Sequence, residues 1–223
     1  MSYNDFVTMR DFSRKRNRGL KNYAIVIAGL FVVALGIIVI QNQATSQGST
    51  MGDVQIGTLA GLQTTDAPWN AGVDHLRERL TTISLPALTA EGTALHTHQH
   101  LDIFIHGRPI AVPSGIGVNE SAGFISPIHV HDTTNVIHVE SPLIQKFTLG
   151  QFFDVWGVRF DQNAIGGYVA DATSTLKIYV NGELFSGNPR TIELTAHEEI
   201  AITFGTSQEQ IPIPATYLFS PEL

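Results

Sequence analysis

The chain has 223 residues, of which 43% are hydrophobic and only 15% are charged, enough for one globular domain and a smaller additional segment. It contains no cysteine, which excludes disulfide frameworks, thiolate metal sites and cysteine nucleophiles. The formal net charge is -7, but residues 1–21 carry six basic against two acidic side chains, a charge of +4 that leaves -11 on the rest. Because phosphate contacts need clustered Lys and Arg, we expect no nucleic-acid partner for the acidic part.

An almost wholly apolar run of 18 residues extends from Tyr23 to Ile40. A helix needs about 20 such residues to cross a bilayer, so the run predicts a single transmembrane helix over 23–40. The basic residues precede this run, and the next basic residue after it is Arg77. The positive-inside rule therefore predicts a single-pass protein of the cell membrane, with the basic segment 1–22 in the cytoplasm and the rest outside. The lipid bilayer is an expected partner, and other membrane proteins are further candidates.

Two alternatives to an uncleaved anchor stay open. The first is a cleaved secretory signal, which is disfavoured because the apolar run exceeds the usual length of roughly 7 to 15 residues and no clear small-x-small site follows it. The second is a pilin-like surface-assembly subunit whose precursor is cut after Gly19, although Lys21 and Asn22 interrupt the expected apolar start. The intact mass of the membrane-extracted protein separates the three cases.

Residues 41–70 are rich in Gln, Thr, Ser, Gly and Ala, which predicts a flexible tether to an extracytoplasmic domain over 71–223. Apolar residues then recur at helical spacing from Val73 to Ile83, which indicates a short amphipathic helix. Pro86 ends any continuation of that helix.

A second, packed helix is expected over 147–157. Thr148 can cap its first turn, Gln151 stands where a capping box needs it, and Gly157 suits the end. The remainder is rich in β-strand patterns, including a hairpin at Asn181-Gly182. We therefore predict a mainly β (α+β) domain, an antiparallel β-sandwich or a helix-backed sheet, with a cupin or cupredoxin-like barrel as the alternative.

Seven of the nine histidines lie in two short segments with alternating patterns. In the first segment the apolar residues Leu101, Ile103 and Ile105 share one face of a predicted strand. The opposite face carries His96, His98, His100, Asp102, Phe104 and His106. A straight strand cannot aim all these imidazoles at one ion, so the run is expected to divide between neighbouring sites.

The second segment forms a hairpin if residues 132–135 make a four-residue loop. The register then pairs His131 with Val136, Val130 with Ile137, His129 with His138, and Ile128 with Val139. In that register all the aliphatic pairs fall on one face and three histidines on the other. A slip of one residue would mix the two faces, so the agreement favours this register.

Imidazoles on neighbouring strands are typical of a metal site. The predicted ligands are His96, His98, His100, His129, His131 and His138, and the further candidates are His106, Asp102 and Glu140. His75 and His197 are expected to be ordinary surface residues. The absence of cysteine and the position of Met51 in the tether leave no soft ligands in the domain, so a divalent transition metal, Zn or Cu(II), is favoured.

Two classes of function fit such a site. The first is a metal-binding protein for metal capture, delivery or support of a membrane complex. The second is a metal-dependent hydratase, hydrolase or oxidase, in which three histidines hold the ion and Glu140 or Asp102 acts as base or orients a ligand. Binding is favoured because no separate catalytic residue set stands out, and the catalytic residues are therefore not assigned.

Overall fold

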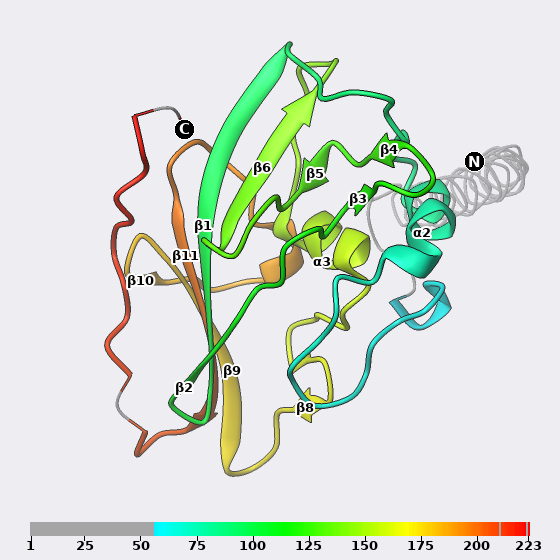
Figure 1. The fold of residues 1–223 in the computed structure, drawn as a ribbon. Coiled ribbons are helices and arrows are strands. Elements are labelled where there is room, and N and C mark those ends of the chain that lie inside the picture. Colours follow the sequence, from blue (N-terminus) through cyan, green and yellow to red (C-terminus); the bar gives the residue numbers. More distant parts are fainter. Residues whose placement is uncertain (1–55, 210, 222) are drawn as a thin grey trace, which may run out of the picture. The chain divides into compact units, whose positions relative to one another are not determined.

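A computed structural model of the protein describes residues 56–209, 211–221 and 223, all within the compact unit Gly52–Leu223. Over these residues the protein is mainly β with a few short helices, as predicted (Figure 1). The basic segment 1–22, the helix predicted over 23–40 and the first part of the tether lie outside the described residues. Among the residues that are described, no helix is both long and apolar enough to cross a membrane.

A seven-stranded sheet is the largest of the sheets in the described part of the chain. Its strand order is β10-β9-β11-β1-β6-β5, and β2 pairs with β1 off this path. In the same order these strands span Glu183–Leu184, Ser174–Val180, Glu199–Thr206, Leu95–Ile105, Val136–Ser141, Ile128–His129 and, for β2, Arg108–Ile110.

The topology corrects two expectations. β1 and β11 run parallel, whereas the other neighbouring strands run antiparallel, so the sheet is mixed and not antiparallel. The parallel pair joins His100 to Glu199, residues so far apart in the chain that no turn or short pattern indicates the pairing. Within the described residues the sheets are open, so the alternative of a closed cupin or cupredoxin-like barrel is wrong.

In the part of the chain that the structure describes, two small hairpins and three 3-10 turns lie around the sheet. The hairpins are β3–β4 (Val118–Asn119 and Phe124–Ile125) and β7–β8 (Ala164–Ile165 and Tyr168–Val169). The turns are η2 (Ile56–Thr58), η3 (Val73–His75) and η4 (Pro189–Thr191). The hairpin predicted at Asn181-Gly182 is present and joins β9 to β10.

The helix α3 (Leu149–Trp156) confirms the predicted caps. The Thr148 side chain accepts a hydrogen bond from the Gln151 backbone N–H, and the Gln151 side chain accepts one from the Thr148 N–H, which completes the capping box. Gly157 ends the helix with a left-handed φ of 74°. Phe152, Phe153 and Trp156 of α3 are fully buried, so they belong to the core as expected.

The helix α2 (Leu76–Thr82) forms where helical spacing predicted it, and it buries Leu76 and Leu80. It also buries Arg79, whose guanidinium donates hydrogen bonds to the backbone carbonyls of Ala60, Gly72 and Val155. These bonds connect three separate segments of the chain. Desolvation lowers the pKa of Arg79 to about 10, and the carbonyl acceptors satisfy its buried N–H groups.

Residues 59–70 pack on the domain, although their composition predicted the end of a flexible tether. Leu59 and Trp69 are buried, and the Trp69 ring makes an edge contact with Trp156 at 5.8 Å between centroids. Gln63 forms a parallel bridge with Val158. A buried Trp outweighs the polar residues around it, because burying a large aromatic ring removes much apolar surface from water.

The two faces of the large sheet differ in character. One face is buried in the core that also contains the α3 aromatic residues. It carries Leu101, Ile103 and Ile105 of β1 and Ile200 and Ile202 of β11. The opposite face carries the predicted metal ligands. The C-terminal segment 211–221 runs beside this sheet in an extended path (Figure 1).

Candidate metal centre

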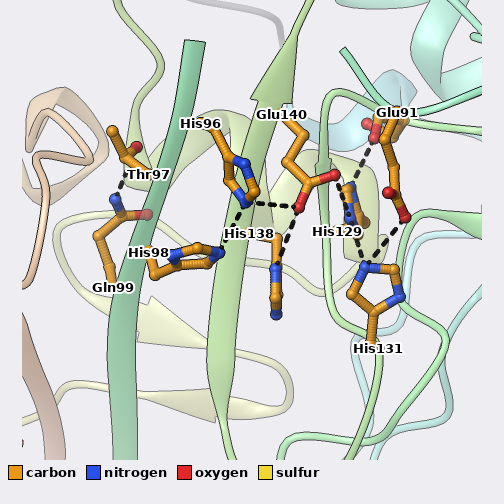
Figure 2. Close-up of polar contacts among 10 residues, drawn as sticks. Glu91, His96, Thr97, His98, Gln99, His129, His131, His138 and Glu140 are labelled. Atoms are coloured by element: carbon orange, nitrogen blue, oxygen red, sulfur yellow. Dashed lines mark hydrogen bonds and ion pairs between the residues drawn. The ribbon is translucent and has the colours of Figure 1, made fainter. Parts of the chain in front are cut away.

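Six side chains from three neighbouring strands and the loop after one of them gather on the polar face of the sheet (Figure 2). We call them the histidine cluster: His96, His98, His129, His131, His138 and Glu140. The antiparallel register of β1 and β6 places His98 opposite His138 and His96 opposite Glu140. On the other side of β6, His129 of β5 stands opposite His138.

The predicted hairpin register is confirmed for two of its pairs, Ile128 with Val139 and His129 with His138. β5 ends at His129, and the next residue pairs elsewhere, because the Val130 N–H donates to the Ile116 carbonyl at 2.9 Å. The expected pairs of Val130 with Ile137 and His131 with Val136 are therefore wrong. The His131 ring nevertheless joins the cluster, with its centroid 4.5 Å from that of His129.

The first half of the cluster lies over β1 and β6. The Nε2 atom of His96 is 3.1 Å from Nε2 of His98 and 3.1 Å from Oε1 of Glu140. The Nδ1 atom of His138 is 3.4 Å from the same carboxylate oxygen. One ligand atom from each of these four residues lies within 4.8 Å of the others.

The second half lies over β6 and the end of β5. The Nε2 atoms of His129 and His131 are 3.0 Å apart, and Nε2 of His129 is 3.8 Å from Oε2 of Glu140. Together with His138, these residues form a second group whose ligand atoms lie within 4.8 Å of one another. Glu91, from the chain before β1, adds a carboxylate oxygen 3.3 Å from Nε2 of His131.

The spacing of these atoms suits a metal ion. Zn–N bonds of about 2.0–2.1 Å in a tetrahedral site put neighbouring ligand atoms about 3.3–3.4 Å apart. The distances from His96 to His98, His96 to Glu140 and His138 to Glu140 fall between 3.1 and 3.4 Å. In the metal-free protein, an N–H···N hydrogen bond accounts for the close imidazole pairs, since one ring of each pair can donate.

Burial keeps several of these ligands in the form that binds metal. It lowers the pKa of His98 and His129 to about 4 and that of His138 to about 3, so these imidazoles are neutral at pH 7. Burial also raises the pKa of Glu140. The rings of His96 and His131 lie at the rim, with side chains 53% and 40% exposed, so the cluster has an inner and an outer part.

A backbone hydrogen bond fixes the orientation of His129. Its Nδ1 lies 2.9 Å from the Ser126 carbonyl oxygen, which can only accept, so the proton resides on Nδ1. The Nε2 lone pair then points toward the cluster. Metal-binding histidines commonly donate their second ring N–H to a carbonyl or carboxylate in this way.

His100 does not join the histidine cluster. His100 lies on β1 at the last residue that pairs with β6, and on its other side it stands opposite Glu199 of β11. Its Nδ1 lies 2.8 Å from Oε2 of Glu199. The Tyr217 ring stacks on it at 3.8 Å between centroids. His100, Asp102 and Glu199 form a separate group of close ligand atoms. The first histidine run therefore divides between two places, as expected.

Two further histidines lie in loops away from the cluster, the candidate ligand His106 and the expected surface residue His197. His106 lies in the turn between β1 and β2, with a positive φ of 49°, and its Nδ1 contacts Glu209 at 3.3 Å, apart from the cluster. His197 is exposed, as expected, but its backbone N–H donates to the His98 carbonyl at 2.7 Å. Glu91 is the cluster neighbour that sequence reasoning missed, because it lies in a segment without periodicity.

A groove of about 650 Å³ opens beside the cluster. His131 and His138 line one side of it, and Tyr217, Leu218 and Phe219 of the C-terminal segment line the other. The groove gives the imidazoles on this side access to solvent and room for a small molecule. Comparison of the chain with protein-family models, with curated proteins and with solved structures found no match.

Proposed function

We propose that this protein is a membrane-anchored, extracytoplasmic domain that binds a divalent transition metal, Zn or Cu(II). A single transmembrane helix over 23–40 would hold a helix-backed sheet outside the membrane, where the histidine cluster captures or delivers the ion or supports a larger membrane complex. The observation that carries the proposal is the convergence of five imidazoles and a buried carboxylate at ligand spacing.

The chemistry of the donor set favours these metals. Neutral imidazole nitrogens bind Zn and Cu(II) well, whereas Mg and Ca prefer sites made of oxygen. The fixed tautomer of His129 and the burial of His98 mean that the ligands are positioned before the ion arrives. A site organised in advance binds more tightly, because less side-chain freedom is lost on binding.

A metal-dependent hydratase, hydrolase or oxidase is the second candidate function. The groove beside His131 and His138 favours it, since an enzyme needs space for a substrate next to the ion. In that case three histidines would hold the ion, which would supply water activation for hydration or hydrolysis, or redox chemistry for oxidation. An ion whose coordination is saturated by protein ligands would count against this alternative.

Elemental analysis of the full-length, detergent-extracted protein tests metal binding. The wild type is expected to retain Zn or Cu after gel filtration against a metal-free buffer. A variant with both His129→Ala and His131→Ala is expected to hold less metal than the wild type, because each ligand in a four-ligand site contributes about 3 kcal/mol, a factor of about 100 in affinity.

His75→Ala is the matched control, because His75 is an exposed histidine on η3 that contacts only Glu78 among the ion pairs of the described residues. It is expected to retain the metal content of the wild type. An equal metal content in the double variant and the wild type would refute the assignment of the site, and a wild type that holds no metal under any loading condition would refute metal binding itself.

A further inference from the structure

Glu140 occupies a special position within the histidine cluster. Its carboxylate is buried between the two halves of the cluster, with the side chain only 5% exposed. Oε1 faces His96 at 3.1 Å and His138 at 3.4 Å, whereas Oε2 faces His129 at 3.8 Å. The two oxygens of one carboxylate thus point at two different sets of imidazoles (Figure 2).

The cluster is too large and too wide for one ion. A tetrahedral site takes four ligands, but here five imidazoles and a carboxylate converge. Within the cluster, one group of close ligand atoms contains the pair His96 and His98, and the other contains the pair His129 and His131. No group of mutually close atoms in the described residues contains both pairs. Only His138 and Glu140 belong to both groups.

We propose that the histidine cluster holds two divalent ions bridged by the Glu140 carboxylate. One ion is bound by His96, His98 and Oε1 of Glu140, and the other by His129, His131 and Oε2. Carboxylate-bridged ions in two-metal sites lie about 3.5–4 Å apart, which a single buried carboxylate can span. This inference deepens the proposed function and depends on it.

The remaining contacts suit the same arrangement. His138 lies between the two groups and supplies a further nitrogen to one of the ions. Glu91, at 3.3 Å from Nε2 of His131, adds a second carboxylate at the ion bound by His129 and His131 and partly balances its charge. A Glu140 that bridges two ions is a ligand, so this arrangement leaves no general-base role for its carboxylate.

The stoichiometry of the full-length protein in detergent gives the first test, with Cu(II) as the probe. After desalting, elemental analysis is expected to find two copper ions per wild-type chain. One copper per chain would overturn the two-ion centre while leaving the proposed metal binding intact. No bound metal after loading with either Cu(II) or Zn would overturn both.

Electron paramagnetic resonance on the wild type gives a test that needs no variant. The first equivalent of Cu(II) is expected to give an ordinary mononuclear signal, and the second is expected to reduce the signal per copper, because two bridged Cu(II) ions couple their spins. Two independent, uncoupled signals that grow in proportion to added copper would overturn the bridge.

Two double variants separate the halves of the centre. His96→Ala with His98→Ala, and His129→Ala with His131→Ala, are each expected to retain one uncoupled copper, while the His75→Ala control retains two coupled ions. Loss of all copper from both folded double variants would contradict two separate half-sites. Glu140→Gln is expected to abolish the coupling, since an amide does not bridge as a carboxylate does; retained coupling would assign the bridge to another group.

Discussion

Acidification is expected to destabilise the metal-free domain, because three imidazoles of the histidine cluster are buried in the neutral form. Burial lowers the pKa of His98 and His129 to about 4 and that of His138 to about 3, from 6.5. Between about pH 4 and 6.5 the unfolded chain therefore binds more protons than the folded one. The free energy of unfolding rises with pH where this holds, so it falls as the pH is lowered through this window.

The magnitude is clearest for His129, whose side chain is fully buried. One pKa unit corresponds to about 1.36 kcal/mol, so at about pH 5 its protonation in the unfolded chain lowers the free energy of unfolding by about 2 kcal/mol. A domain of this size would lose about 4–8 °C in Tm. The groups that face the ring are the imidazoles of His131, His96 and His98, which lower its pKa further, the stacked ring of His138, and the carboxylate of Glu140.

Urea unfolding in the presence of a chelator, at about pH 7, 6 and 5, measures this effect. The wild type is expected to lose stability at each step, and His129→Gln is expected to lose about 2 kcal/mol less over the same range. His75→Gln removes an exposed histidine and should keep the wild-type pH dependence. If the free energy of unfolding falls equally as the pH is lowered in the wild type and in His129→Gln, or if the wild type gains stability on acidification, the assignment of a buried neutral imidazole at His129 is refuted.

Three further predictions concern residues outside the histidine cluster. Thr148→Ala removes the cap of α3 and should cost about 1 kcal/mol, or about 2–4 °C in Tm by calorimetry; an unchanged Tm would contradict the capping box. Gly157→Ala places a Cβ 2.8 Å from the Arg79 Cζ at a φ of 74°, so urea unfolding should show a loss of about 1–3 kcal/mol, and no loss would mean that the backbone adjusts freely. His100→Ala leaves the buried Glu199 carboxylate without its imidazole, which should cost about 1–3 kcal/mol but leave the metal content of the histidine cluster unchanged. A fall in metal content would instead assign an ion to the group around His100.

The features predicted correctly from the sequence are those set by neighbours in the chain. Alternation with a period of two assigned Leu101 and Ile103 to the buried face of β1, and the short loop after His131 set the pairs of β5 with β6. The capping box at Thr148 could be predicted because it depends on two residues only three positions apart in the chain. Each of these signals lies within a few residues, where the backbone geometry is nearly fixed.

Contacts between distant segments were not predictable in the same way. Glu91 approaches His131 from a segment without helix or strand periodicity, and neither its composition nor its spacing indicates this position. Val130 pairs with the backbone of Ile116 in the loop after β2, which shortens β5 to two residues. The hairpin pattern alone predicted a longer β5, because an alternating sequence carries no information about a competing partner strand.

The separation of His98 from His100 follows from the order of the strands. β1 pairs with β6 from Leu95 to His100 and with β11 from His100 to Ile105, so His100 stands where the two registers meet. Alternation puts both histidines on the same face of the sheet, yet the neighbour across that face differs, since His98 lies opposite His138 and His100 lies opposite Glu199. The parallel pairing with β11 thus gives His100 a carboxylate partner of its own. A metal centre assigned from the alternating sequence alone would include His100. Only the order of the strands shows that His100 lies outside the histidine cluster.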